Sequence, residues 1–133
     1  AVSPNEPVDP DSLHRDIAPD KWGVTRKDLR CLRKDVAAAI RQGTILPTTL
    51  DEFDPLDMVF GPTIYTVNEQ YIKPVTAKAG GMSWALMRHP RGLTCDLFVT
   101  HCWQEGLFEF VDKVVRSWPQ GAKSAWCCML ANP

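Results

Sequence analysis

The sequence has no long hydrophobic run, because no stretch of about 18 apolar residues occurs in its 133 positions, and it therefore predicts no transmembrane segment. Its first residues do not form a signal-peptide pattern. Neither phosphate-binding pattern, G-x-G-x-x-G or G-x-x-x-x-G-K, is present, and the cysteines lack the C-x-x-C pairs of zinc sites. These absences predict a chain without a bound cofactor, a metal or catalytic residues.

Five cysteines are present, an odd number, and two of them are adjacent at Cys127-Cys128. Neighbouring strand residues point to opposite faces, so this pair is poorly placed for disulfide bonding, and free cysteines are commonly buried. The composition therefore predicts a reducing compartment, such as the cytosol, a stroma or a matrix. A first residue Ala1 in place of Met suggests either processing or an incomplete chain.

Net charge is also small, at −1, but it is unevenly distributed. Residues 1–20 sum to −4, residues 21–43 to +5, residues 44–70 to −5 and residues 71–133 to +3. Blocks of alternating sign can pair within the chain or with a protein partner. They are not typical of a nucleic-acid-binding protein, so the predicted partners are other protein chains.

Residues 1–24 read as a proline-rich, acidic, extended tail. Prolines at positions 4, 7, 10 and 19 disfavour a continuous helix or an interior strand. Such a tail becomes ordered by wrapping its own domain or by docking on another chain, and both alternatives stay open. The residues predicted to bind a partner are Glu6, Val8, Asp9 and Asp11.

Residues 25–92 form a predicted helical segment with an acidic connector. A capping pattern at Thr25 starts a helix that ends near Gln42, with Gly43 after it. Its basic residues form a solvated face or a docking face for an acidic surface or anionic lipid headgroups: Arg26, Arg30, Arg33, Lys34 and Arg41. The connector, residues 44–61, is acidic, and the basic helix is its simplest predicted partner.

Two shorter helices are predicted between this connector and residue 92. The first runs from about Pro62 to Lys73, with Pro74 restarting a turn that ends at Gly80-Gly81. The second spans residues 82–87 around Trp84, where a strand was the alternative.

Residues 93–133 predict a βαβ unit. Thr94 to His101 and Ala125 to Ala131 read as buried strands, and a helix from about Glu105 to Trp118 connects them in parallel. The expected buried residues are Leu97, Val99, Phe110, Val111, Val114, Cys127 and Met129. Two strands cannot complete a core, so the unit is either the start of a longer domain or is completed by another chain.

A ligand would lie beyond the carboxyl ends of these strands, and the possible ligand edge is His101, Trp103 and Glu105. His101 and Cys102 could supply a base and a nucleophile. Adjacent strand residues diverge, however, and catalysis by this pair is disfavoured.

The run Asp96-Leu97-Phe98-Val99-Thr100-His101, followed by Phe108-Glu109-Phe110-Val111, resembles the opening of a Toll/interleukin-1 receptor (TIR) type domain. This resemblance implies a TIR-like or flavodoxin-like α/β fold over about 40 residues. TIR-type enzymes hydrolyse NAD with a glutamate on a later helix, which matches no residue here, and Glu105 does not inherit that role. A longer stretch, from Gly61-Pro62 to Cys127-Cys128, is similar to a group of dinoflagellate proteins and implies a photosynthetic protist as source.

The sequence therefore favours a non-catalytic accessory subunit that docks on a larger assembly. The implied source suggests an organellar photosynthetic complex such as a photosystem, on the stromal side, with peripheral contact to a membrane complex. The alternative is the front part of a TIR-like NAD-hydrolysing or signalling domain in the cytosol.

Overall fold

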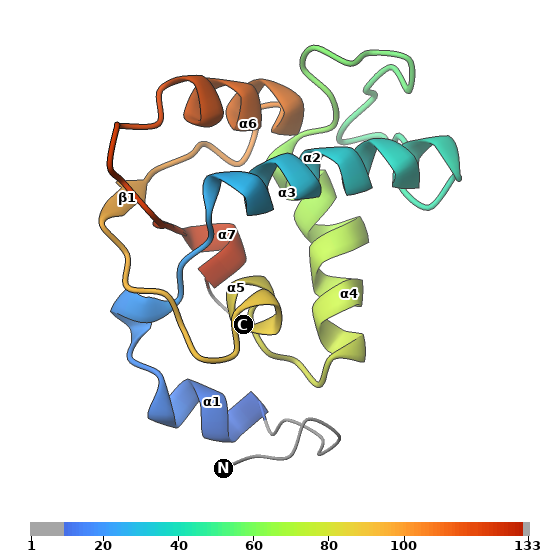
Figure 1. Ribbon diagram of the computed structural model, residues 1–133. Helices are drawn as coiled ribbons and strands as arrows, with labels where there is room; N and C mark the ends of the chain where they lie inside the picture. The colour runs from blue at the N-terminus through green and yellow to red at the C-terminus, as the bar shows by residue number, and fades with distance from the viewer. Residues whose placement is uncertain (1–9, 132–133) are drawn as a thin grey trace.

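The helix predicted after Thr25 is the central element of the structure, a computed structural model that describes residues 10–131. This helix, α2 (Arg26–Arg41), crosses the middle of the molecule (Figure 1). The predicted cap is confirmed: Thr25 Oγ1 accepts from the Asp28 amide at 3.0 Å, and the Asp28 carboxylate accepts from the Thr25 amide at 2.8 Å. Gly43, with φ +77°, follows the helix end. The apolar stripe is buried as expected: Leu29, Leu32, Val36 and Ile40.

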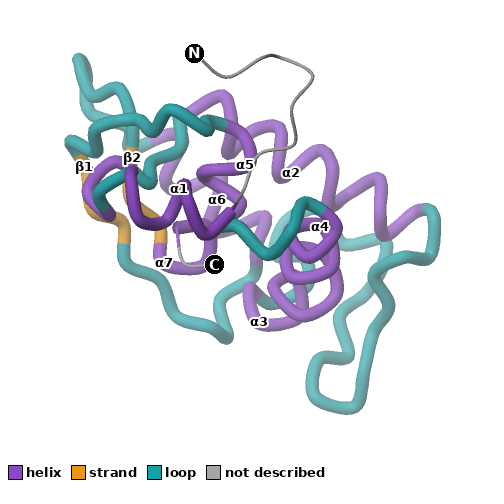
Figure 2. Tube along the Cα trace, turned by 90° about the horizontal axis from the view of Figure 1, so that it is seen from below, coloured by secondary structure: helices purple, strands orange, loops and turns teal. Residues whose placement is uncertain are grey.

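The predicted parallel strand pair is confirmed. Strands β1 (Leu97–Val99) and β2 (Ala125–Cys127) pair in parallel, with Phe98 opposite Trp126, and they lie side by side in Figure 2. Helix α6 (Leu107–Arg116) connects them and packs against α2. On the far side of β2, Val24 exchanges two main-chain hydrogen bonds with Ala125, at 2.9 and 2.8 Å. Strand β2 is therefore hydrogen-bonded along one edge to β1 and, at Ala125, along the other edge to Val24.

The strands are shorter and more exposed than predicted. The β1 strand begins only at Leu97 because the preceding residues serve other contacts: the Cys95 amide donates to the Asp20 carbonyl, and the Thr94 carbonyl accepts from the Ser124 hydroxyl. The prediction that both faces are buried is wrong, since the Phe98 side chain is 73% exposed. Successive side chains alternate between faces, and α6 covers only one of them. Of the expected core, Phe110, Val111, Cys127 and Met129 are buried, whereas Leu97, Val99 and Val114 are half-buried.

The second predicted strand also ends early. The chain turns at Cys128 into a short helix, α7 (Cys128–Ala131), where the sequence predicts strand up to Ala131. Methionine, leucine and alanine are good helix formers, and a single turn is too short for its periodicity to be recognised. The turn carries Met129, Leu130 and Ala131 into the core, with α7 packed on α5.

One continuous helical rod occupies residues 64–78, where the sequence predicts a break at Pro74. It consists of α3 (Ile64–Val67), a π-helical turn (Asn68–Ile72) and α4 (Lys73–Lys78). Proline lacks an amide hydrogen and crowds the carbonyl one turn before it, which is tolerated at the start of a helical segment. The wider π-helical turn places Pro74 at such a start, so the rod continues.

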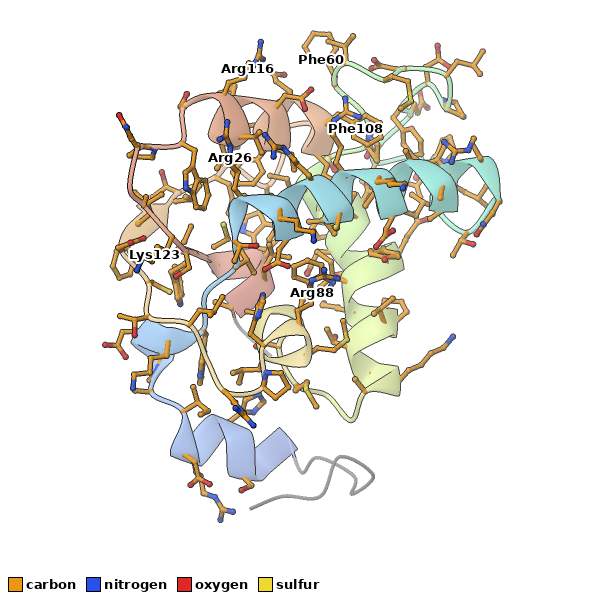
Figure 3. The ribbon with its side chains drawn as sticks, viewed as in Figure 1. Arg26, Phe60, Arg88, Phe108, Arg116 and Lys123 are labelled. Atoms are coloured by element: carbon orange, nitrogen blue, oxygen red, sulfur yellow. The ribbon has the colours of Figure 1, made fainter. Side chains whose placement is uncertain are left out.

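Helix α5 (Trp84–Arg88), capped by Ser83, confirms the predicted short helix and anchors α2. The Asp28 carboxylate, 4% exposed, accepts from Arg88 Nε at 2.9 Å and lies 2.6 Å from His89 Nε2. Arg88 also stacks over Trp84, with 5.0 Å from its guanidinium carbon to the ring centre. In Figure 3 Arg88 projects from α5 toward α2. The carboxylate that caps α2 therefore also fastens it to α5.

The N-terminal segment differs from the extended tail that the sequence predicts. Residues Pro10–Asp16 form helix α1, in which Pro10 holds the first position, and a 3₁₀ turn follows at Pro19–Lys21. The Trp22 indole donates to the Ile17 carbonyl at 2.9 Å. Residues from Ile17 onward are therefore attached to their own domain, while Glu6, Val8 and Asp9 lie outside the described residues.

Candidate functional site

The predicted ligand edge is partly assembled around His101, which follows β1. Its ring meets those of Trp103 and Phe110 edge-on, with centroids 4.8 and 5.9 Å away. Both ring nitrogens are inaccessible to water and make no hydrogen bond of good geometry. Burial lowers the His101 pKa, opposed by the Glu105 carboxylate and the Cys102 main chain. Glu105 itself lies 3.5 Å from the Lys113 ammonium, so the edge holds an aromatic cluster beside an ion pair.

A small cavity of about 150 Å³ lies just beyond the carboxyl ends of both strands. Trp103, which follows β1, and Cys128, which follows β2, form one wall, and the helical rod forms the other. Two of its polar groups are already engaged: Lys73 Nζ is 2.6 Å from Glu69, and the Thr76 hydroxyl donates to the Ile72 carbonyl. Ligand pockets usually measure about 300–1,000 Å³, so this cavity is too small for a nucleotide. His101 and Glu105 do not line it.

Cys95 and Cys127 are not activated as nucleophiles. Burial raises the Cys127 pKa to about 12 and also raises the pKa of Cys95, which keeps both as thiols. Cys102 is exposed, and no hydrogen bond joins it to the His101 ring nitrogens. Within residues 10–131, no three His, Cys, Asp or Glu side chains are grouped as ligands for a metal ion.

Burial of His101 should make the stability of the folded chain depend on pH. Its folded-state pKa lies below the unfolded value of about 6.5, so the unfolded chain binds more protons, and stability falls as the pH drops through that range. Replacing it with an apolar ring, His101→Phe, should remove this part of the pH dependence without lowering stability at neutral pH, since no hydrogen bond is lost. Urea unfolding at about pH 7.5 and about pH 5.5 measures both effects. A variant with an unchanged pH slope would contradict this assignment.

The predicted basic face of α2 is divided by the structure. Arg33 is not a docking charge, because its guanidinium donates to the Asp112 carboxylate at 2.9 and 3.2 Å and to the Met58 carbonyl at 2.7 Å. It also lies 4.4 Å above the Phe108 ring. The remaining exposed members are Arg30, Lys34 and Arg41. Arg26 is half-buried and, with Lys27 and Lys123, lines an open hollow of about 530 Å³.

The sequence predicts that the acidic side chains of the connector bind the basic helix, but in the structure they bind other groups. Asp57 accepts from the amides of Val59 and Phe60, which lowers its pKa, while Asp54 accepts from the Leu56 amide. Asp51 accepts from the Thr63 amide and the Thr66 hydroxyl, at 2.8 and 2.6 Å. For Asp54 and Asp57, an unbonded amide two or three residues away is a nearer partner than a helix side chain. Asp54 and Asp57 therefore fold the connector itself, and Asp51 joins it to the start of α3.

This folded connector presents an apolar surface that sequence reasoning missed. Leu50 and Leu56 are 84% and 86% exposed. We call the exposed side chains of the segment the connector surface: Leu46, Leu50, Leu56, Met58, Val59 and Phe60. In Figure 3 Phe60 lies above Phe108 of α6, at the edge of the molecule. An available signal was the apolar cluster Leu56-Asp57-Met58-Val59-Phe60, which is unusual in a solvated connector.

Comparisons with known proteins do not assign the chain to a family. No family model, no curated protein and no solved structure matches the chain. Within residues 10–131, no helix has both the length and the apolar character needed to cross a membrane. The functional conclusions therefore depend on the surfaces of the chain itself.

Proposed function

We propose that the chain is a non-catalytic accessory subunit that docks on a larger assembly through the connector surface. The observation that carries the proposal is the exposure of six large apolar side chains within residues 46–60. Scattered apolar residues are normal on a protein surface, but a concentration of this kind marks an interaction site. Burying such side chains on a partner is the main favourable term in protein association.

The rigidity of the connector supports a binding role. Asp57 and Asp51 hold its turns through main-chain amides, and Arg33 fixes the Met58 carbonyl from α2. The Gly61 backbone lies so close to the Phe108 ring that a Cβ there would stand 2.6 Å from a ring carbon. A surface already held in one conformation loses less entropy when it binds.

The chemistry of the partner follows from the surroundings of these side chains. Glu52 and Asp54 are exposed beside Leu50 and Leu56, and residues 44–70 contain no lysine or arginine. A protein surface with an apolar groove and a basic rim would complement this arrangement, whereas phosphate backbones would be repelled. The resemblances noted above support a photosynthetic assembly such as a photosystem, reached from the stromal side as a peripheral contact.

A second candidate is the front part of a TIR-like NAD-hydrolysing or signalling domain. The parallel βαβ unit and the cavity beyond its carboxyl ends favour it. Incubating the purified chain with NAD and measuring nicotinamide release tests the enzymatic form. Turnover by the chain alone would replace the accessory-subunit proposal.

The docking proposal predicts the behaviour of a connector double variant, Leu50→Asp with Leu56→Asp. The tagged chain is expressed in cells, and native electrophoresis separates its high-mass complex from the free chain. We expect the ratio of free to bound chain to be at least about tenfold higher for the variant than for the original chain, a loss of about 1.4 kcal/mol in binding free energy. Its melting temperature should hardly change, because exposed substitutions alter stability by about 0.5 kcal/mol or less.

The control for this experiment is Phe98→Asp, which adds one negative charge, where the double variant adds two, at an exposed apolar side chain of β1, outside the connector. It should remain in the complex. Equal release of both variants would show that added charge, not the connector surface, disrupts assembly. Retention of the double variant would refute docking through the connector.

A further inference from the structure

Within residues 10–131, no strand pairs with the outer edge of β1. The described sheet consists of β1 and β2 alone, and apart from the pairing with β2 no main-chain hydrogen bond is made to residues Leu97–Val99. In a parallel pair, alternate residues direct their amide and carbonyl groups away from the neighbouring strand. This edge therefore offers unpaired main-chain groups to an added strand.

An apolar groove of about 320 Å³ runs along the same edge. Strand β1 with Thr100 forms one side, and Val114 of α6 forms the other, together with Trp118 and Pro119, which follow that helix. Phe98 stands exposed above it, and its ring centroid is 6.0 Å from that of Trp126. The groove and the ring pair provide side-chain contacts next to the main-chain edge.

The lack of opposing charges along the edge lets it pair with a second copy of itself. Residues 97–100 carry no charge, and Asp96 is held by the amides of Lys123 and Ser124, at 3.0 and 3.1 Å. An antiparallel pairing about a two-fold axis through Phe98 places Asp96 of each copy opposite Thr100 of the other. No like charges meet, and the two Phe98 rings face each other as a cross-strand aromatic pair.

We propose that two copies of this chain associate through their β1 edges, in antiparallel register about Phe98, to form one continuous sheet. The site is separate from the connector surface, so the dimer is independent of the proposed docking. Only a short strand is paired, and the association is accordingly weak and depends on concentration.

Sedimentation equilibrium of the purified chain tests this dimer. We expect a monomer–dimer equilibrium with a midpoint below about 1 mM. Phe98→Lys should shift it at least about tenfold toward monomer, because it sets two lysines opposite each other at the axis. The connector variant Leu56→Lys should leave it unchanged, since Leu56 is also exposed but belongs to the connector, which lies on the opposite side of the molecule from β1 (Figure 1).

Hydrogen exchange provides the second readout. The amides of residues 97–100 should exchange more slowly at high than at low protein concentration in the original chain, and equally at both in Phe98→Lys. Exclusively monomeric protein up to about 1 mM would overturn the proposal. So would a dimer that Leu56→Lys abolishes, or one that forms without protection at β1. Failure of the dimer proposal would leave the proposed docking through the connector intact, and failure of the docking proposal would leave the dimer proposal intact.

Discussion

Replacing Asp28 with alanine should lower the free energy of unfolding by about 3 kcal/mol, because one buried carboxylate holds both a helix start and a second helix. Its oxygens accept from the Thr25 amide and from Arg88, and they contact His89. The substitution leaves these donors without their acceptor. Urea unfolding at neutral pH measures the loss.

The same carboxylate should account for part of the acid sensitivity of the chain. Burial acts to raise the Asp28 pKa, but the bonds with Thr25, His89 and Arg88 outweigh it, and the folded-state pKa is lowered. The unfolded chain therefore binds more protons, and the stabilisation is complete above about pH 4 and lost as the pH falls below it. In Asp28→Asn, this part of the fall in the free energy of unfolding at low pH should disappear.

Asp112→Asn is the matched control, since it removes a carboxylate from a half-exposed pair with Arg33. Exposed ion pairs contribute about 0–1 kcal/mol, so its effect should be much smaller. If both substitutions were equally mild, the Asp28 contacts would not be what joins α2 to α5.

The second large effect is expected for Gly106→Ala, at the start of α6. An added Cβ would stand 2.2 Å from the Phe60 carbonyl oxygen and 2.8 Å from its carbon. The connector must then move away, although the Phe108 amide donates to that same carbonyl at 3.0 Å and the Leu107 amide to the Pro62 carbonyl at 2.8 Å. Overpacking together with a weakened hydrogen bond should destabilise the fold by about 3 kcal/mol.

Gly121→Ala separates crowding from backbone strain. Gly121 has φ +86° but nothing within 4 Å of an added Cβ, so only the strain of about 1 kcal/mol applies. Thermal unfolding compares the two variants, and hydrogen exchange at Leu107 and Phe108 should accelerate only in Gly106→Ala. Equal melting temperatures would mean that the connector moves away from the added Cβ with little loss of stability.

Elements with a strong local signal could be predicted from the sequence. Helix α2 has a capping box at Thr25 and four apolar residues at helical spacing, and its predicted span agrees with the structure. The parallel βαβ arrangement followed from the change of period after His101. In contrast, α7 is one turn long, and Pro74 continues a helix only because a π-helical turn precedes it.

The candidate site was less predictable because it depends on which of several partners each polar group selects. The charges of Asp51 and Asp57 suggested ion pairs with α2, yet main-chain amides bind these carboxylates, at Val59 for Asp57 and at Thr63 for Asp51. Arg33 belonged to a plausible docking face but finds Asp112, 79 positions away in the chain. Trp103 lines the cavity at the sheet edge as the strand order suggested, whereas His101 is enclosed by aromatic rings.

The bridge between Val24 and Ala125 limits how far the sheet can extend by association. Each copy brings one open edge, at β1, while the edge of β2 is already occupied by its own chain at Val24. Pairing of two β1 strands uses both open edges, so the combined sheet ends at a Val24 segment on either side. Strand addition therefore closes at two copies, and the exposed edge does not serve as a template for fibre growth.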